Sequence, residues 1–365
     1  MTPFRNVAIV GVGVIGGSLG LALKRKFQDI HVTGISSPKT LDEALALHAI
    51  DAGFERGSLA EGVSEADLVF VCAPISVILD LLPDIASAVP DGALVTDVGS
   101  TKAAVMRKAS ECFGGTRHFV GGHPMAGNEG RGVAWADALL FENAVWVLTP
   151  SGFVPKERFD ALAGLIQTLG AHVLVLDPAR HDRIAATVSH LPQMLAVTLM
   201  NLVANQNDPD PYLKLAAGGF RDMTRIASSP YAIWKDIFST NRDLVDRLMD
   251  DFIVEFKSNR DRLSRDELED QFLRSAKSRL SIPKDTKGFL QTHYDASVQV
   301  EDRPGVIAAI AIALAEAKIN IKDIEIVKVR EGEAGTLRLS FESESERSRA
   351  LMVLEHIGFR ARIRS

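Results

Sequence analysis

The chain has 365 residues, of which 46% are hydrophobic and 24% are charged, and its formal net charge at pH 7 is -6. This composition is typical of a globular protein of about two to three domains. The acidic balance argues against nucleic acid as the main partner. No apolar run is long enough for a membrane helix, and no signal peptide precedes the first apolar run, so we expect a cytoplasmic protein. The two cysteines make no disulfide framework, and no Cys/His spacing predicts a metal site.

A glycine-rich turn follows the first apolar run, Val7–Val10, which is typical of a buried parallel strand. Gly11, Gly13 and Gly16 form a GxGxxG pattern, and a helical pattern follows it. In this context the pattern indicates a dinucleotide site. Gly11 permits a tight turn, Gly13 lets a pyrophosphate approach, and Gly16 lets helix and strand pack closely. The alternative is a glycine-rich packing turn without a ligand.

The second strand, Ile30–Ile35, leads to the position where a dinucleotide fold usually carries an acid that holds the ribose. Here that position is Ser36, and Lys39 lies close by. Without a carboxylate nothing repels a 2′-phosphate, and the serine hydroxyls with Lys39 could receive one, so this position leaves both NAD and NADP open. The residues expected at the cofactor are Gly11, Gly13, Val14, Ile15, Gly16, Ser36, Ala73 and Pro74.

The alternation of strands and helices continues with predicted strands at Asp67–Ala73 and Ala93–Val98. Ligands of open α/β sheets bind at the carboxyl ends of strands. Pro74, Ser100 and His123 all follow or end such strands. Ser100 is a candidate substrate contact, although a helix N-cap explains it equally well. Further strands are predicted at Ala144–Leu148 and His172–Leu176, with a helix between them.

The stretch Gly121–Gly132 holds five glycines and one histidine, His123. We expect a strand, then a loop carrying His123, then a helix over 133–140. A histidine that titrates near neutral pH is a good candidate for moving protons. The alternative is a structural turn with a solvent-facing histidine.

From Pro178 to about Leu280 the pattern is almost wholly helical, and His190 lies on one of these helices. A helical domain after a dinucleotide-binding domain is expected to close the cleft and supply a dimer interface. Arg221 and Arg225 are four residues apart, which places them on one helical face. They are candidates for a carboxylate clamp, or for a solvated basic face paired with nearby acids.

A linker over 281–291 precedes a third unit with the order βαββαβ, which predicts a ferredoxin-like fold. Its Asp302-Arg303-Pro304-Gly305 turn leads into a strong helix. A unit of this size without a nucleophile or metal site is more often regulatory than catalytic. The predicted domains are 1–177 (Rossmann-type, dinucleotide-binding), 178–282 (all-α) and 293–365 (ferredoxin-like).

The combination of motifs resembles bacterial prephenate dehydrogenases of tyrosine biosynthesis that carry a C-terminal ACT domain. The resemblance covers essentially the whole chain. It rests on the glycine pattern and on four further motifs, namely Thr96–Lys102, Gly122–Gly127, Ser189–Pro192 and Gly218–Ala227, with the Asp302–Val306 turn for the ACT domain.

The resemblance implies oxidative decarboxylation of prephenate to 4-hydroxyphenylpyruvate with NAD. It implies that His123 takes the proton of the ring hydroxyl and that Ser100 orients the hydroxyl or His123. Arg225 would bind a substrate carboxylate, Arg221 would add positive field, and His190 would line the pocket. A homodimer is implied, and tyrosine, the end product, is the expected effector at the ACT domain.

The chain departs from the family pattern at Gln193, where a second histidine is common, and at Ser36. The first departure bears on how the pyruvyl side chain is held, and the second on the choice of NAD. Arogenate, which has an amino group on the side chain, is an alternative substrate. A non-catalytic sensor of dinucleotides or amino acids is an alternative from another functional class. The joint presence of Ser100, His123 and Arg225 argues against it.

Overall fold

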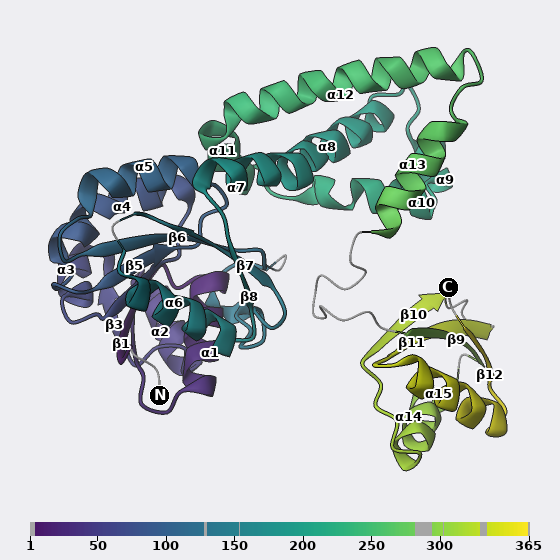
Figure 1. Ribbon diagram of the computed structural model, residues 1–365, viewed down its shortest axis with the longest axis horizontal. Coiled ribbons are helices and arrows are strands. Elements are labelled where there is room, and N and C mark those ends of the chain that lie inside the picture. Colours follow the sequence, from purple (N-terminus) through teal and green to yellow (C-terminus); the bar gives the residue numbers. More distant parts are fainter. Residues whose placement is uncertain are drawn as a thin grey trace. The chain divides into compact units, whose positions relative to one another are not determined.

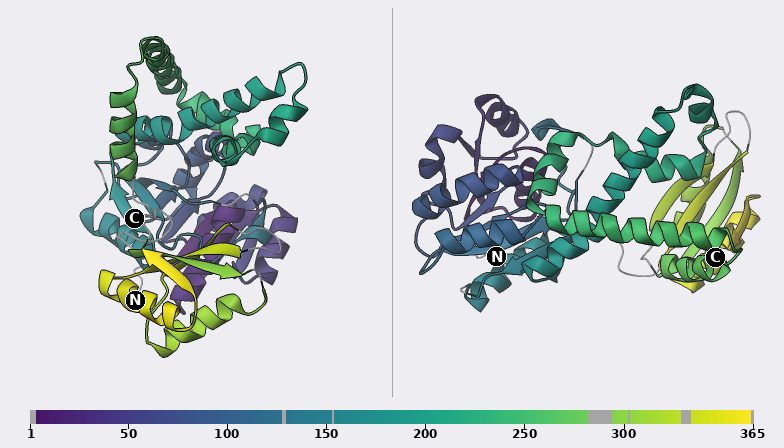
Figure 2. Two further views of the ribbon diagram at one scale, coloured as in Figure 1. Left: turned by 90° about the vertical axis from the view of Figure 1, so that its right-hand side faces the viewer. Right: turned by 90° about the horizontal axis from the view of Figure 1, so that it is seen from above.

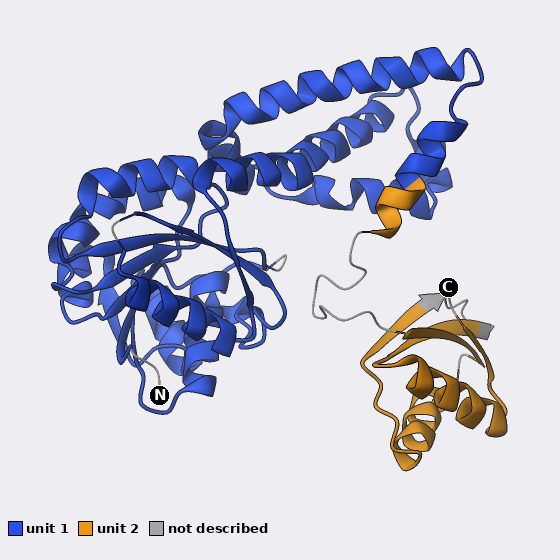
Figure 3. Cartoon of the chain, viewed as in Figure 1, with its two compact units in different colours: residues 1–275 blue, residues 276–365 orange. Residues whose placement is uncertain are grey.

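The structure is a computed structural model that describes residues 4–127, 130–152, 154–281, 294–301, 303–328 and 334–363. The chain divides into two compact units, residues 1–275 and 276–365 (Figure 3). Each unit has hydrophobic cores of its own. The finer boundary that the sequence predicts near residue 177 stays a prediction.

The first unit is built on an eight-stranded sheet with the order β3-β2-β1-β4-β5-β6-β7-β8. All neighbouring strands are parallel except β6 and β7, which are antiparallel. The strands are β1 (Asn6–Val10), β2 (His31–Ser36), β3 (Ala52–Glu55), β4 (Leu68–Val71), β5 (Leu94–Asp97), β6 (His118–Pro124), β7 (Val145–Pro150) and β8 (His172–Val175). β3 was not predicted from the sequence.

Helices cover both faces of this sheet (Figures 1 and 2). One core packs α1 (Val14–Lys26), α2 (Pro38–Ala46) and α6 (Lys156–Thr168) onto the strands. A second core packs α3 (Leu59–Val63), α4 (Ile75–Ala88) and α5 (Ala103–Cys112) onto the other face. Because both faces are covered, the central strand β4 is buried along its whole length, which explains its unbroken apolar sequence.

The strand order reverses between β1 and β4, which are neighbours in the sheet. From β1 the chain builds outward to β2 and β3, and from β4 it builds the other way. Such a switch point is where doubly wound sheets bind dinucleotides, at the carboxyl ends of the strands. The predicted Rossmann-type fold is confirmed.

Two expectations for the stretch around His123 are wrong. His123 does not lie on a loop, because β6 continues to Pro124 and pairs His123 with Val147 of β7. No helix covers residues 133–140, where the structure has only the short 3-10 turn η2 (Val133–Trp135) followed by turns. The apolar period of this segment instead reflects Val133, which is buried in the core beside α1.

The helical region after β8 is confirmed. It comprises α7 (Pro178–Ala185), the π-helical turn η3 (Ala186–His190), α8 (Leu191–Ala204), α9 (Asp210–Leu215), α10 (Gly218–Thr224), η4 (Arg225–Ser228), α11 (Tyr231–Thr240), α12 (Arg242–Leu263) and α13 (Glu269–Leu280). The π turn ends at His190, two residues before Pro192, which cannot donate a backbone hydrogen bond and crowds the carbonyl four residues earlier. Such π turns are rare inside α-helices, and they occur frequently at functional sites.

The second unit carries a four-stranded antiparallel sheet with the order β10-β11-β9-β12. Its elements are β9 (Tyr294–Glu301), α14 (Val306–Glu316), β10 (Asp323–Lys328), β11 (Ala334–Phe341), α15 (Glu344–His356) and β12 (Arg360–Ile363). The predicted βαββαβ fold is confirmed. Asp302 of the predicted turn and most of the predicted linker, residues 282–291, lie outside the described residues.

Candidate functional site

The glycine motif forms a cradle between β1 and β4. A side chain at Gly11 would lie 2.2 Å from the carbonyl oxygen of Cys72, and Gly11 has a positive φ of 97°. A side chain at Gly16 would lie 2.1 Å from the carbonyl oxygen of Gly11. Both positions therefore require glycine for close packing. Gly13, in contrast, faces open space and precedes the N-terminus of α1, which has no side-chain cap.

A pocket of about 500 Å³ opens beside this cradle. It is lined by Gly11 and Gly13, by Ser36 at the end of β2, and by Ala73 and Pro74 after β4. The free amide groups and the dipole of a helix N-terminus suit a pyrophosphate. The residues present therefore fit a dinucleotide. Val14, Ile15 and Gly16 belong to the first turns of α1 and do not line the pocket.

His123 is only 9% exposed and its ring contacts His181 of α7. The His123 Nδ1 and His181 Nε2 atoms are 2.8 Å apart. No described residue hydrogen-bonds to His123 Nε2. Burial holds the pKa of His123 well below its ordinary value of 6.5, and the neighbouring His181 and Lys102 add to the shift. His123 is therefore a neutral imidazole at neutral pH, with one nitrogen engaged.

Asp182 joins the helical region to the sheet. Its Oδ1 lies 2.8 Å from His181 Nδ1 and accepts a hydrogen bond from the Lys102 backbone amide at 2.6 Å. Its Oδ2 accepts from the Ala103 amide at 2.8 Å. The carboxylate thus caps the first turn of α5, which has no side-chain cap of its own. Ser100, the expected N-cap, does not fill that role, because α5 begins at Ala103.

A buried ion pair lies next to these histidines. The Lys102 ammonium contacts the Asp97 carboxylate, and both side chains are fully buried. Asp97 also accepts hydrogen bonds from the backbone amides of Gly99 at 2.8 Å and Gly122 at 3.0 Å. Asp97 therefore fixes the chain that follows β5 to the strand that carries His123. Burial lowers the pKa of Lys102, and Asp97 opposes that shift.

His190 is 1% exposed. It is linked to Asp182 through Asn241, whereas His123 is linked to Asp182 through His181. Asn241 donates to the backbone carbonyl of Asp182 at 2.9 Å, and its amide nitrogen is 3.3 Å from His190 Nδ1. The His190 ring also meets Trp234 edge to face, 6.1 Å between centroids. Burial lowers the pKa of His190 to about 4. His190 and His123 therefore belong to one connected cluster.

Ser100 is half-buried between β5 and α5 and forms no hydrogen bond with His123 among the described residues. The partner of His123 is His181 instead. The next residue, Thr101, has its hydroxyl 2.8 Å from that of Thr240, which ties this segment to α11. The predicted role of Ser100 toward a substrate stays a prediction.

Arg221 and Arg225 are both exposed, and neither forms an ion pair with a described residue. They do not share one continuous helix, because α10 ends at Thr224 and Arg225 begins η4. Gln193 is buried, and it donates to the backbone carbonyl of Ile226 at 3.0 Å. This bond ties the turn of Arg225 to α8, the helix that follows His190. The structure does not bring either arginine into contact with His123.

Sequence reasoning missed His181, Asp182 and Asn241, and it gave no role to the Lys102–Asp97 pair. The signal for Asp97 and Lys102 was their place in the Thr96–Lys102 motif after a buried strand. His181 and Asp182 looked like the polar start of a helix. Only their burial, 2% and 1% exposed, marks them as unusual.

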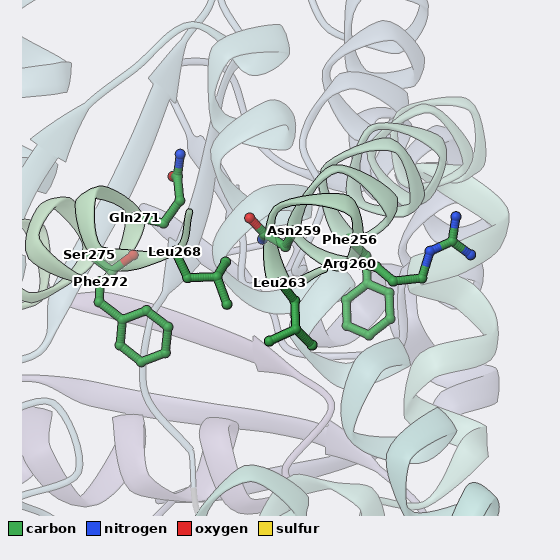
Figure 4. Close-up of a pocket in the computed structure, with 8 residues that line it drawn as sticks. All are labelled: Phe256, Asn259, Arg260, Leu263, Leu268, Gln271, Phe272 and Ser275. Carbon is green, nitrogen blue, oxygen red and sulfur yellow. The ribbon is translucent and has the colours of Figure 1, made fainter. Parts of the chain in front are cut away.

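A second pocket, of about 440 Å³, lies between the end of α12 and α13 (Figure 4). Its lining is Phe256, Asn259, Arg260, Leu263, Leu268, Gln271, Phe272 and Ser275. None of these residues belongs to the cluster around His123. Several of its apolar side chains are well exposed, including Phe272 at 73%.

The helices described by the structure include none with the length and apolarity needed to cross a bilayer.

Three family models match the chain in succession. Residues 19–175 match the prephenate dehydrogenase nucleotide-binding domain, residues 177–278 match the prephenate dehydrogenase dimerization domain, and residues 294–353 match the ACT domain. The second region contains His181, His190, Arg225 and the pocket between α12 and α13. The histidine cluster is therefore built from residues of the first two regions.

The chain is also similar to characterised and solved proteins. It is 38% identical to a prephenate dehydrogenase of Bacillus subtilis over 96% of this chain and 95% of the relative. A crystal structure of prephenate dehydrogenase from A. aeolicus with hydroxyphenyl propionate and NAD+ superposes with a TM-score of 0.70, at 29% identity over 76% of this chain and 98% of that one. The Synechocystis arogenate dehydrogenase superposes with a TM-score of 0.68, at 28% identity over 76% of this chain and 100% of that one. The chain belongs to the prephenate dehydrogenase family.

Proposed function

We propose that this chain performs the family's reaction, NAD-dependent oxidative decarboxylation of prephenate, with His123 as the general base. The dehydrogenase activity and the use of NAD follow from family membership. The single observation that supports the role of His123 is its environment. It is a neutral, buried imidazole whose Nδ1 is engaged by His181, while no described residue hydrogen-bonds to Nε2.

The chemistry balances with His123 in this role. His123 Nε2 takes the proton of the ring hydroxyl while the carbon that bears the hydroxyl loses its hydride. Bound NAD supplies the acceptor for that hydride. The electrons of the bond to the ring carboxylate pass into the ring, carbon dioxide leaves, and the ring becomes aromatic. The phenolate oxygen then regains a proton, which His123 can return.

The cofactor pocket gives the adenosine end of a dinucleotide a polar and non-acidic surface. Ser36, Thr40 and Arg56 line it, and no aspartate or glutamate is among its lining residues. This supports binding of NAD through hydroxyl contacts. It also leaves room for the 2′-phosphate of NADP, which the Arg56 guanidinium would favour.

The substrate side of the site is formed by the helical region. We assign a substrate carboxylate to Arg225, with Arg221 adding positive field, because neither guanidinium is neutralised by a described acid. His190 and Ser100 are assigned to the same substrate site. Gln193 Oε1 is buried and has no described partner, and such an acceptor would suit the ammonium group of arogenate. Arogenate is therefore the second candidate substrate.

Two partners complete the proposal. The chain pairs with a second copy through the helical region, supported by the dimerization-domain match over 177–278 and by the exposed apolar side chains of α12 and α13. Tyrosine binds at the ACT unit, where Gly305, with a φ of 89°, turns the chain directly into α14. A glycine there lets a backbone amide approach an amino-acid carboxylate.

The test is to measure turnover of His123→Asn with prephenate and with arogenate, each with NAD and NADP, by following the reduced cofactor. General-base catalysis contributes roughly 10²–10⁴-fold, so we expect kcat to fall by about that factor. The dissociation constant for NAD should stay within about twofold, because His123 does not line the cofactor pocket. Near-normal turnover of the variant would rule out His123 as the base.

A further inference from the structure

We propose that His181 and Asp182 are positioning residues that fix the tautomer of His123, placing its proton on Nδ1 and leaving Nε2 free to accept a proton. The inference rests on the proposed role of His123 as base and extends it to two residues of α7. The three side chains form a linear hydrogen-bonded series. Its links are 2.8 Å from Asp182 Oδ1 to His181 Nδ1 and 2.8 Å from His181 Nε2 to His123 Nδ1.

The donor and the acceptor in each hydrogen bond of this series are fixed, because the group at one end can only accept. An ionised carboxylate can only accept, so the atom that faces it, His181 Nδ1, must carry a proton and donate it. In a neutral imidazole only one nitrogen carries a proton, so His181 Nε2 is then an acceptor. The nitrogen opposite it, His123 Nδ1, must therefore donate. The remaining nitrogen, His123 Nε2, is left with a lone pair.

The alternative is a doubly protonated His181, which would donate at both ends and place the proton of His123 on Nε2. That arrangement needs a strong negative charge on Asp182. The negative charge of Asp182 is already partly compensated by hydrogen bonds from the backbone amides of Lys102 and Ala103 and by the N-terminal dipole of α5. The Lys102 ammonium, which contributes to lowering the pKa of His123, adds positive charge to the same cluster. One proton on His181 is therefore enough to satisfy Asp182.

The consequence for the reaction is specific. A histidine with its proton on Nε2 would present a donor to the ring hydroxyl and could not remove its proton. Which nitrogen of a histidine is protonated is set by the hydrogen bond at the other nitrogen. When His123 becomes an imidazolium during turnover, the same series gives its Nδ1 proton an acceptor, with the carboxylate beyond it. His181 and Asp182 act through His123 and need not touch the substrate.

The experiment compares two substitutions of similar size in the full-length protein, His181→Gln and His181→Leu. Glutamine can accept from His123 Nδ1 through its carbonyl oxygen and donate to Asp182 through its amide. Leucine can do neither. We expect His181→Gln to keep kcat within about tenfold and His181→Leu to lower it by roughly 100-fold or more. The Michaelis constant for NAD should change by less than about twofold in both. His48→Asn, at an exposed histidine, is the control and should leave all constants unchanged.

The direct readout is ¹⁵N NMR of protein labelled only at histidine, with the His123 signals assigned from the His123→Asn spectrum. We expect a protonated Nδ1 and a bare Nε2 at pH 7.5 in the native protein and in His181→Gln, and loss of that assignment in His181→Leu. A proton on Nε2 of His123 in the native protein would overturn the proposal, as would equal kcat values for the two variants. Because the tautomer is read without substrate, this outcome is separate from a failure of His123 as base, which His123→Asn turnover reports.

Discussion

Arg225 is an exposed cation at the start of η4, and no described acid neutralises it. A guanidinium that pairs with a substrate carboxylate contributes a charge-assisted hydrogen bond of about 1.5–3 kcal/mol. We therefore expect Arg225→Gln to raise the Michaelis constant for prephenate by one to two orders of magnitude, at about 1.4 kcal/mol per tenfold. Steady-state kinetics with prephenate varied at saturating NAD gives the value.

The matched control for this prediction is Arg221→Gln, which removes an equal charge one element away and should raise the constant less. If Arg225→Gln instead leaves the constant unchanged and lowers the urea midpoint of unfolding, the arginine stabilises the fold and does not hold substrate.

His190 makes the stability of the first unit depend on pH. Its pKa is lowered from 6.5 to about 4 by burial, so the folded chain keeps it neutral while the unfolded chain protonates it below 6.5. The unfolded state then binds more protons, and stability falls as pH falls from 6.5 toward 4. The slope from this group is about 1.4 kcal/mol per pH unit at most. Between pH 7 and pH 5 the folded state should lose about 2 kcal/mol through His190.

Urea unfolding of the native chain and of His190→Gln at the two pH values checks this expectation. Glutamine keeps an acceptor for Asn241 but does not titrate, so the variant should lose less stability on acidification. His48→Asn serves as the control for removing an exposed histidine. An equal loss in native protein and His190→Gln would contradict the prediction.

Among single residues, the sequence predicted those whose identity is required by contacts with residues close by in the chain. Gly11 and Gly16 are required by contacts within one strand-turn-helix unit, and the pattern of glycines records them. His123 stood out because a histidine followed a strand and a glycine pair. His181 could not be found, because its partner lies 58 residues away and the contact exists only once α7 packs beside β6.

Among the helices, α12 and α13 differ most from what the sequence predicts. The sequence from Lys257 to Arg279 is highly charged and predicts an exposed helix. The structure has two helices that hold apolar side chains around the pocket of Figure 4, and Phe256 and Phe272 remain 66% and 73% exposed. Exposed aromatic clusters of this kind mark protein interfaces.

We expect Phe272→Glu to weaken the proposed dimer by at least tenfold in its dissociation constant. A buried aromatic anchor commonly contributes 2 kcal/mol or more to an interface, and each 1.4 kcal/mol is about tenfold. Analytical ultracentrifugation over a concentration series measures the constant. Ser278→Glu adds the same charge to the same helix without removing an apolar group, and it should have a smaller effect. An unchanged constant for Phe272→Glu would place the interface elsewhere.

The errors in predicted elements share a physical cause. β6 extends through His123 because β7 supplies backbone partners up to Pro124, and no local pattern announces that pairing. The segment after Gly132 has a helical period but forms only a 3-10 turn, because Val133 must reach the core beside α1. The strands of the first sheet other than β3 and the helical character of residues 178–280 were predicted, since their apolar period alone decides them.

For the molecule as a whole, the second unit has its own core and its own sheet. We expect a shortened chain ending at Ser281 to keep dehydrogenase activity and to lose its response to tyrosine. A ligand alters activity only by binding two states of a protein unequally, and the coupling is typically 1–3 kcal/mol. The measurement is turnover against tyrosine concentration for both chains, and inhibition is the expected sign in the full-length chain.

Calorimetry of the full-length chain with tyrosine decides the assignment independently of turnover. Absence of binding there would exclude the regulatory role whatever the shortened chain does. Phenylalanine, which lacks the phenolic hydroxyl, is the matched control ligand and should bind more weakly.

The hydrogen bonds accepted by the Asp182 carboxylate make it possible to measure how often the helical region separates from the sheet. The amide hydrogens of Lys102 and Ala103 are bonded to that carboxylate and to no carbonyl of their own helix. They can exchange with deuterated water only when α7 moves away from the start of α5. Their exchange rates therefore count those openings directly. A bound substrate that holds the two regions together should slow these two hydrogens more than those in the middle of α5.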